Sequence, residues 1–600
     1  MLGSRTRTVQ RDNEADAARS ATGFFARRGW MGEASIGLGL LLLRLVAILA
    51  FVALTNFGIA QRLHLLADQQ RWGTLAVFVT LWGVCLAALL IGAFQPNAGL
   101  RIGWAVIFAG STGLGVVFRW ASGSDLTVLD IISMWHVRHE AVRAADFYQH
   151  HIELFSMIFA GALVILAAAP SGLTTRASRW LGRLWWAPAL PVVLIAAILF
   201  QKEGGGASGL PRQFTPLAVG AVSGMVLANN PVPQRSEVEW TPGLPRVRSI
   251  VLLVDESVRG DYIDWTPGNP YTPGLASRAA SISNFGPAAS GGNCSHYSNA
   301  ILRFMGSRNR LGKALLTNPT IWQYAKKAGF RTVYIDAQAS IISSSGKMQN
   351  FMTTSELRSI DSFQLVGDAV APAELDNRML DMIKAELATD EPVFIYAVKN
   401  GAHFPYDMGY PPEEVLFRPT MTEAPKDDAS ARIRSYRNVV RWSVDRFFAR
   451  VFDELELDNT VILYTSDHGQ QFRTDRLPHC TVEQPDPREA LVPLFTITGH
   501  AQLKTQFDQS ALSGRGHASH FAIMPAILEL IGYDTREVSV IYPESLLKTN
   551  LVPLQFTSGD ILGLFSNRIR WHPLDLDQDY LEQLEPDRIN VRPAAAHAAW

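Results

Sequence analysis

The chain has 600 residues, of which 48% are hydrophobic and only 18% are charged. Soluble proteins carry about 25% charged residues, so the composition argues against a wholly soluble chain. The formal net charge of −1 offers no basic surface for a polyanion, and we expect no nucleic acid among the partners. Cys85 lies in an apolar run, so at most Cys294 and Cys480 can pair, which excludes a disulfide framework.

Apolar segments dominate the first third of the chain. Five of them approach the roughly 20 residues that cross a bilayer, and they lie at residues 36–57, 73–94, 102–118, 154–169 and 185–200. The last two are short, and Pro188 and Pro191 interrupt the fifth. We therefore predict an all-α membrane domain of five transmembrane helices.

Arginines set the expected orientation of these spans. The tail before residue 36 is rich in arginine, and the loop between the fourth and fifth segments carries Arg176, Arg179 and Arg183. By the positive-inside rule both lie in the cytoplasm, so the chain after Phe200 is exported. The tail is too long and polar for a cleaved signal peptide, and we expect the first span to remain as an anchor. Arg44, inside that span, can extend to the near interface.

Two polar segments outside the spans have open interpretations. Residues 125–152 form an exported loop with apolar residues at helical spacing around His136 and Glu140. It either lies on the membrane, where Glu140 would contact a lipid headgroup, or is a solvated linker. Residues 201–248 are rich in Gly, Pro and polar residues and suit a linking arm.

From Ser249 onward, strand-like and helical patterns alternate. The expected strands are 249–254, 332–335, 393–398, 461–465 and 492–497, and the expected helices are 321–328, 374–386, 431–455 and 521–531. Such alternation predicts an α/β sandwich with a mostly parallel sheet covered on both faces.

Acids and histidines follow three of these strands. Glu256 comes just after the first, His403 follows the strand at 393–398, and Asp467 and His468 end the strand at 461–465, with His479 soon after. The carboxyl ends of parallel strands are where ligands bind, and carboxylate oxygens with imidazole nitrogens suit zinc. We therefore predict a metal site. Gly469 is expected to let the backbone turn sharply beside the metal.

A hydroxyl nucleophile is also available. Small residues lead into Ser295 and then into an apolar stretch, which places Ser295 near the N-terminus of a helix. Helix N-termini favour anions such as phosphate or sulfate esters. A metal-coordinated Ser295 oxygen could attack such an ester, although a serine there is also a common helix cap.

Together these motifs resemble the alkaline phosphatase superfamily, and within it the sulfatase-like, membrane-anchored phosphoethanolamine transferases. Residues 254–261 (Val-Asp-Glu-Ser-Val-Arg-Gly-Asp) are similar to the family motif Val-Gly-Glu-Thr-x-Arg-x-Asp, and residues 292–298 to the nucleophile motif Gly-Thr-x-Thr-x-x-Ser. The resemblance covers about residues 35–570. It implies Glu256, Ser295, Asp467 and His468 as ligands of one or two zinc ions, Ser295 as nucleophile, and His403 and His479 as residues that bind phosphate or a second zinc.

The sequence also departs from the family pattern. Serine replaces the usual threonine nucleophile, and a one-residue shift would make Cys294 the nucleophile. Residues 339–345 contain no match for the lysine that binds the substrate. These departures leave the headgroup open, and a related phosphoglycerol transferase or a sulfatase or phosphodiesterase that uses water remain alternatives. Sulfatases mature a cysteine within Cys-x-Pro-x-Arg, which the residues after Cys294 do not match.

The resemblance implies a multi-pass enzyme of the bacterial inner membrane with its catalytic domain in the periplasm. It would move a phospholipid headgroup, phosphoethanolamine or similar, from a phospholipid donor to an envelope lipid or glycan through a covalent enzyme intermediate. The expected parts are a cytoplasmic tail (1–34), the transmembrane domain (35–200), the linking arm (201–248), the catalytic domain (249–570) and a C-terminal tail (571–600).

Overall fold

The computed structural model describes residues 38–582 apart from 69, 123–124, 137–148, 203, 205–206, 230–233, 339–353, 368, 426–427, 474–475, 483 and 565–567. The chain divides into two compact units. One comprises Met1–Trp120, Asp125–Val128 and Tyr148–Gly224, and the other comprises Ala121–Ser124, Leu129–Phe147 and Met225–Trp600. Glu140, the expected headgroup contact, lies outside the described residues.

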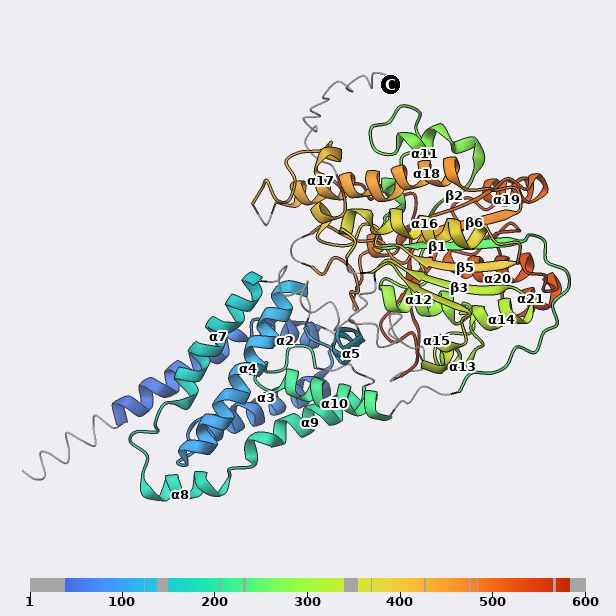
Figure 1. Cartoon of the computed structure of the whole chain (residues 1–600). Helices are drawn as coiled ribbons and strands as arrows, with labels where there is room; N and C mark the ends of the chain where they lie inside the picture. The colour runs from blue at the N-terminus through green and yellow to red at the C-terminus, as the bar shows by residue number, and fades with distance from the viewer. Residues whose placement is uncertain are drawn as a thin grey trace, which may run out of the picture. The chain divides into compact units, whose positions relative to one another are not determined.

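The first unit is helical (Figure 1). Four helices are long and apolar enough to cross a membrane: Leu38–Thr55, α3 (Trp72–Ala93), α4 (Ala98–Ser122) and α7 (Gln149–Ala167). The fifth span predicted at 185–200 corresponds to the helix over Ala187–Gln201, including α9 (Leu190–Gln201), and α8 (Thr175–Arg183) precedes this helix at a bend of 52°. Shorter helices of this unit are α2 (Ile59–Asp68) and most of α10 (Thr215–Asn229), whereas α5 (Val128–His136) falls almost wholly in the second unit. The protein is therefore a multi-pass membrane protein with four to five spans.

Arg44 joins two helix ends rather than standing alone in the apolar interior. Its Nη2 donates to the carbonyl oxygens of Ala93 (2.6 Å) and Leu166 (3.0 Å), at the C-terminal ends of α3 and α7. Arg101 donates in the same way to Ala167 (3.0 Å). Carbonyls at a helix end have no partner within the helix, so these arginines cap the helices at one end of the unit.

The expected linking arm is only partly a linker. Arg212 is buried in the first unit, where its guanidinium donates to the Thr55 carbonyl (2.6 Å) and pairs with Asp125 (2.8 Å). The next residues form α10, which also belongs mainly to this unit. The chain after α9 thus packs against the ends of the membrane helices, because Arg212 finds polar partners there in the Thr55 carbonyl and Asp125.

A seven-stranded sheet organises the second unit, with strand order β2-β7-β6-β1-β5-β3-β4. The strands are β1 (Ser249–Asp255), β2 (Ile282–Ala289), β3 (Arg331–Asp336), β4 (Ser362–Leu365), β5 (Val393–Val398), β6 (Thr460–Ser466) and β7 (Leu491–Thr498). Only β7 runs antiparallel to its neighbours β2 and β6. The prediction of a mostly parallel sheet is confirmed.

Helices cover both faces of the sheet (Figure 1). Side chains alternate along β1, so Ile250 and Leu252 pack with α14 and α20, whereas Val251 and Leu253 pack with α16, α17 and α18. The helices of this unit are α11 (Pro273–Ser277), α12 (Ser295–Arg303), α13 (Lys313–Thr317), α14 (Ile321–Lys327), α15 (Thr354–Arg358), α16 (Leu375–Leu387), α17 (Ala429–Val440), α18 (Phe447–Glu454), α19 (Ala501–Ser513), α20 (Ile523–Leu530) and α21 (Thr535–Ile541). The sheet is therefore packed between two buried hydrophobic cores, one on each face, which fix the positions of its strand ends.

The structure adds β2 and β4 to the five predicted strands of the sheet, and it differs from the sequence prediction at two further places. The helix expected at 431–455 contains a π-helical segment, Arg441–Arg446, between α17 and α18. The domain also continues beyond residue 570, because β9 (Arg570–Pro573) pairs with β8 (Gln555–Ser558) and Glu582 binds Arg259 (2.7 Å). The chain beyond the expected boundary at 571 thus packs with the domain as far as Glu582, which pairs with the buried Arg259.

Candidate functional site

Two neighbouring strands bring the predicted metal ligands together. In the register of β1 and β6, Asp255 lies opposite Ser466. The next residues on the two parallel strands, Glu256 and Asp467, consequently emerge side by side at the carboxyl edge of the sheet. His468 follows Asp467 directly, so the motif places three candidate ligands at one point.

The three side chains have the donor set of a metal site. One ligand atom from each of Glu256, Asp467 and His468 lies within 4.8 Å of the others, and all three residues are buried. Asp467 Oδ2 is buried without a hydrogen bond to any residue that the structure describes. A buried carboxylate oxygen without a partner is costly, so a cation there would satisfy it. Two carboxylates and one imidazole fit zinc.

Crowding of these groups perturbs their proton affinities in the metal-free site. Burial, with the charge of Glu256, raises the pKa of Asp467 to about 8. Burial alone would lower the pKa of His468, but the charges of Asp467 and Glu256 raise it to about 9. Burial also opposes ionisation of Glu256, yet the hydrogen bond and charge of His468 hold its pKa well below the ordinary value. The site thus holds protons that a metal ion would displace.

His468 is oriented by its own backbone. Its Nδ1 lies 2.6 Å from the Gly469 carbonyl oxygen, which can only accept a hydrogen bond, so Nδ1 carries the proton. The other ring nitrogen, Nε2, is the one that could bind a metal, and it lies 2.9 Å from the Ser295 Oγ. Ser295 Oγ also lies 3.5 Å from Glu256 Oε2. A hydroxyl oxygen held among metal ligands in this way can become a nucleophile.

Ser295 is the first residue of α12, as the sequence predicted. It is half-buried, so a substrate can reach it, and the N-terminal end of the helix favours negative charge beside it. Cys294, the alternative nucleophile, forms a disulfide with Cys480. A disulfide sulfur carries no thiolate, so the structure contradicts Cys294 as nucleophile in this oxidised form.

The same disulfide brings His479 to the site. Cys480, the next residue, is tied to the start of α12 by the disulfide and by its N–H bond to the Asn293 carbonyl (2.8 Å). The His479 ring consequently stacks on His468, with ring centroids 4.1 Å apart. Burial and the charge of His468 lower the pKa of His479 well below its ordinary value, so its imidazole is neutral. His403 is near enough that its charge also acts on Glu256 and His479.

Two further residues hold Glu256 in place and were not predicted as site residues. Gln338, two residues beyond β3, donates from Nε2 to Glu256 Oε2 (3.2 Å) and to the Lys399 carbonyl (2.6 Å). Ser257 donates to Glu256 Oε1 (2.7 Å). The position of Gln338 just after the strand expected at 332–335 was its only signal in the sequence, and that position did not specify a contact with Glu256.

A buried ion pair lies directly behind the site. Lys399 Nζ pairs with Asp255 Oδ2 at 2.5 Å, and both side chains are fully buried. Asp255 Oδ1 accepts the Glu256 N–H (3.0 Å), and the Asp255 carbonyl accepts the Asp467 N–H (2.9 Å). The pair therefore supports the backbone of two candidate ligands. Asp255 stands where the family motif has glycine, which was the only trace of this pair in the sequence.

Glycine is needed at position 469 for a different reason from the predicted one. A Cβ at this position would collide with the carbonyl oxygens of Arg488 and Leu491. Its φ angle is not positive, in contrast to that of Gly401 (φ +53°). Glycine is therefore required by close packing of the backbone, and not by a sharp turn.

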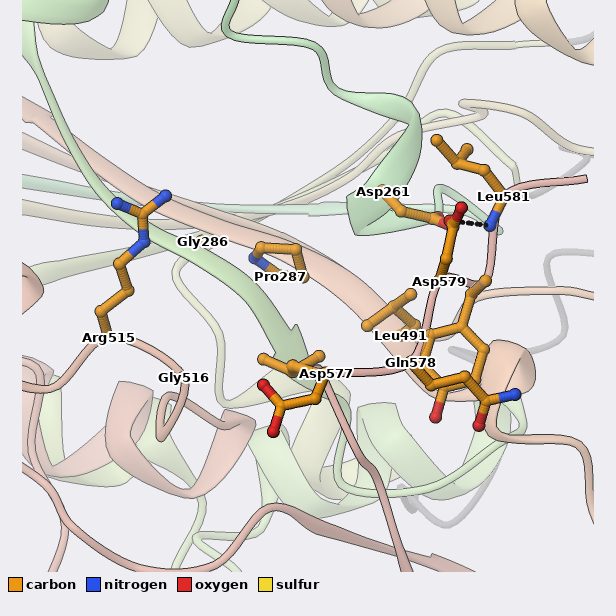
Figure 2. Close-up of a pocket in the computed structure, with 12 residues that line it drawn as sticks. Asp261, Gly286, Pro287, Leu491, Arg515, Gly516, Asp577, Gln578, Asp579 and Leu581 are labelled. Carbon is orange, nitrogen blue, oxygen red and sulfur yellow. Dashed lines mark hydrogen bonds between the residues drawn. The ribbon is translucent and has the colours of Figure 1, made fainter.

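A cavity of about 490 Å³ opens elsewhere in the second unit (Figure 2). It is bordered by β2, β7 and the segment before Glu582, where Leu581 donates to Asp579 (3.1 Å). Its lining residues are Asp261, Gly286, Pro287, Leu491, Arg515, Gly516, Leu576, Asp577, Gln578, Asp579, Tyr580 and Leu581. None of the candidate ligands or the nucleophile contributes to it.

Comparison with known proteins finds a family match in the second unit. Residues 248–533 match the model of the sulfatase family. The lipooligosaccharide phosphoethanolamine transferase A (EptA) of Neisseria meningitidis, an integral membrane protein, has a similar structure. The TM-score is 0.53 at 16% identity, over 73% of this chain and 86% of that one. The likeness shows a shared fold.

Two other relatives are more partial. The Kdo(2)-lipid A phosphoethanolamine 7''-transferase of Salmonella typhimurium is 27% identical over 144 residues, which is 22% of this chain and only 25% of that protein. The C-terminal periplasmic domain of EptC from Escherichia coli, solved as a complex with Zn, is 16% identical with a TM-score of 0.46. That match covers 57% of this chain and 97% of the domain.

Proposed function

We propose that this chain, a multi-pass membrane protein with a sulfatase-family domain, is a metal-dependent transferase of phospholipid headgroups. The observation that carries the proposal is the Ser295 hydroxyl, which lies 2.9 Å from His468 Nε2 and 3.5 Å from Glu256 Oε2 among groups that fit a metal ion. The donor is a phospholipid with phosphoethanolamine or a similar headgroup. The acceptor is an envelope lipid or glycan.

The assigned steps use the residues of this site. Zinc, held by Glu256, Asp467 and His468, would lower the pKa of the Ser295 hydroxyl and polarise the phosphoryl group. Ser295 Oγ forms a bond to phosphorus, and the bond from phosphorus to the diacylglycerol oxygen breaks. The headgroup remains on Ser295 as a phosphodiester until an acceptor oxygen displaces it.

His403 and His479 are assigned to the phosphoryl oxygens and to proton transfer. Because its pKa is lowered, the neutral His479 can accept a proton from an incoming acceptor hydroxyl. His403 is half-buried, and its charge already acts on Glu256 and His479, so it can orient the substrate from the more open side. In the first transfer Ser295 loses a proton and the departing diacylglycerol oxygen gains one. In the second the acceptor hydroxyl loses a proton and Ser295 regains one, so each transfer is balanced.

The protein is assigned to the bacterial inner membrane with the sulfatase domain in the periplasm. The disulfide between Cys294 and Cys480 supports this placement, since disulfides persist in oxidising compartments. Donor and acceptor lipids would then lie in the leaflet that faces the domain. The cytoplasmic side would hold the arginine-rich loop between the fourth and fifth spans.

The test is incubation of the purified full-length protein with a phospholipid labelled in its headgroup. We expect the label on an acceptor lipid or glycan, and transiently on the peptide that contains Ser295. Ser295→Ala should remove both, Ser295→Thr should keep a nucleophile, and Thr317→Ala, at the half-buried end of α13, serves as control. Free headgroup without an acceptor would identify a hydrolase instead, and no label on Ser295 would overturn the assigned intermediate.

Mass spectrometry of envelope lipids and glycans would identify the acceptor. Cells with and without the protein should differ by one headgroup mass on a single class of molecule. An increment of phosphoglycerol in place of phosphoethanolamine would correct the headgroup but keep the reaction.

A further inference from the structure

Helix α8 separates its charged and apolar residues onto different faces. Arg176, Arg179 and Arg183 are spaced three and four residues apart, so they form one row, and all three are exposed. Leu181 lies on the opposite face of the helix, and Trp180, which is 58% exposed, borders the arginine row one turn after Arg176. No residue of α8 is buried within the protein. Such a helix has too little contact with its own chain to be explained by packing alone.

The helix lies at one end of the membrane unit and departs from the direction of the spans. The helix that follows is bent away from it by 52°. Gln95, in the turn between α3 and α4, donates to the Leu181 carbonyl (2.9 Å), which holds α8 beside the end of α3. Trp185 and Trp186, just after α8, are 53% and 51% exposed. Exposed tryptophans gather at the boundary between membrane and water.

This end of the unit is strongly cationic. From residue 170 to residue 201 the sequence contains no aspartate or glutamate. The neighbouring Arg44 and Arg101 are occupied by carbonyls at the ends of α3 and α7. The row on α8 therefore has no carboxylate in its own segment, and its charge is complementary to an anion from outside the chain.

We propose that α8 is an interfacial helix whose arginine row binds the phosphate groups of anionic phospholipids in the adjacent leaflet. Its apolar face would rest at the boundary of headgroups and acyl chains, as amphipathic helices do. Under the proposed topology this is the cytoplasmic leaflet, opposite the reaction. The inference rests on the proposed membrane placement and not on the transfer chemistry.

The test uses the full-length protein in a neutral detergent and counts bound lipids by native mass spectrometry. Phosphatidylglycerol and phosphatidylcholine of equal chain length are titrated separately. We expect a preference for phosphatidylglycerol that falls about fivefold for each arginine changed to glutamine, hence about a hundredfold for the triple variant. A triple Arg→Lys variant keeps the charge and should keep most of the preference.

The control is a triple Arg→Gln variant at the exposed Arg246, Arg378 and Arg536 of the second unit, which makes the same change in charge. It should bind both lipids like the unaltered protein. The proposal is overturned if the α8 variant keeps its preference for phosphatidylglycerol, or if the control variant loses that preference equally. It is also overturned if a polyanion such as RNA, added at the same total phosphate charge as the lipid, displaces the bound phosphatidylglycerol. This experiment measures lipid binding and not headgroup transfer. A failed transferase assay would therefore not affect the conclusion about α8.

Discussion

Replacement of Lys399 by methionine would test the ion pair behind the site. Lys399 Nζ is held by the Asp255 carboxylate and the Ser443 carbonyl, and its side chain is fully buried. Methionine fills a similar volume but leaves the Asp255 charge without its cation. The Tyr464 hydroxyl (2.8 Å) and the Glu256 N–H (3.0 Å) would be its remaining partners.

The magnitude follows from the burial of the pair. Removing one partner of a buried ion pair destabilises a protein by about 3–5 kcal/mol. For a domain of about 300 residues, the unfolding entropy of about 2.1 cal/mol/K per residue converts about 4 kcal/mol into a fall in Tm of about 6 °C. Asp255→Asn combined with Lys399→Met removes both charges, and we expect it to recover much of this loss.

The loss should also depend on pH. Burial raises the pKa of Asp255 to about 6 even with Lys399 opposing it, and without Lys399 the pKa rises further. A carboxyl whose pKa is raised on folding contributes stability below its unfolded pKa and loses it as the pH rises through the folded pKa. The deficit of Lys399→Met should therefore be small near pH 5 and grow as the pH rises above about 6.

Thermal unfolding of the full-length protein, followed by near-ultraviolet circular dichroism, would measure these values. Lys504→Met is the matched control, because Lys504 pairs with Asp508 on the surface of α19, where such pairs contribute about 0–1 kcal/mol. Equal losses for the two variants, or a double variant no more stable than Lys399→Met, would refute the reasoning. A loss that does not change with pH would do the same.

Three further predictions concern the metal site and its disulfide. Because Asp467 and His468 have pKa values of about 8 and 9 without metal, zinc must displace up to two protons. Its affinity should therefore rise steeply between pH 6 and pH 9 in a competition assay with a chelator, and a flat profile would contradict the ligand set. Gln338→Leu removes a hydrogen bond to Glu256 and should weaken zinc binding about tenfold in the same assay, whereas unchanged affinity would exclude that role. Cys480→Ser opens a link between residues 186 apart, and should lower stability by about 2–4 kcal/mol and turnover more than KM, since His479 loses its anchor. Cys85→Ala is the control, and equal effects of the two variants would count against the anchor.

The sequence alone determined where the chemistry lies along the chain. Apolar runs ending in Glu256 or in Asp467 and His468 are local patterns, because strand propensity and the polarity of the next residue are written in adjacent positions. The parallel sheet followed from the alternation of strands and helices, and it implied that these ends meet at one edge. The helix that begins at Ser295 was readable for the same reason.

Only the tertiary structure decided which groups touch. The disulfide removes Cys294 as a nucleophile and brings His479 onto His468, although 186 residues separate the two cysteines. The pairing of Lys399 with Asp255, the contact of Gln338 with Glu256 and the backbone packing at Gly469 likewise join distant segments. Such contacts depend on the order of the strands across the sheet. A sequence pattern reveals only which residues are neighbours along the chain, so it does not predict these contacts.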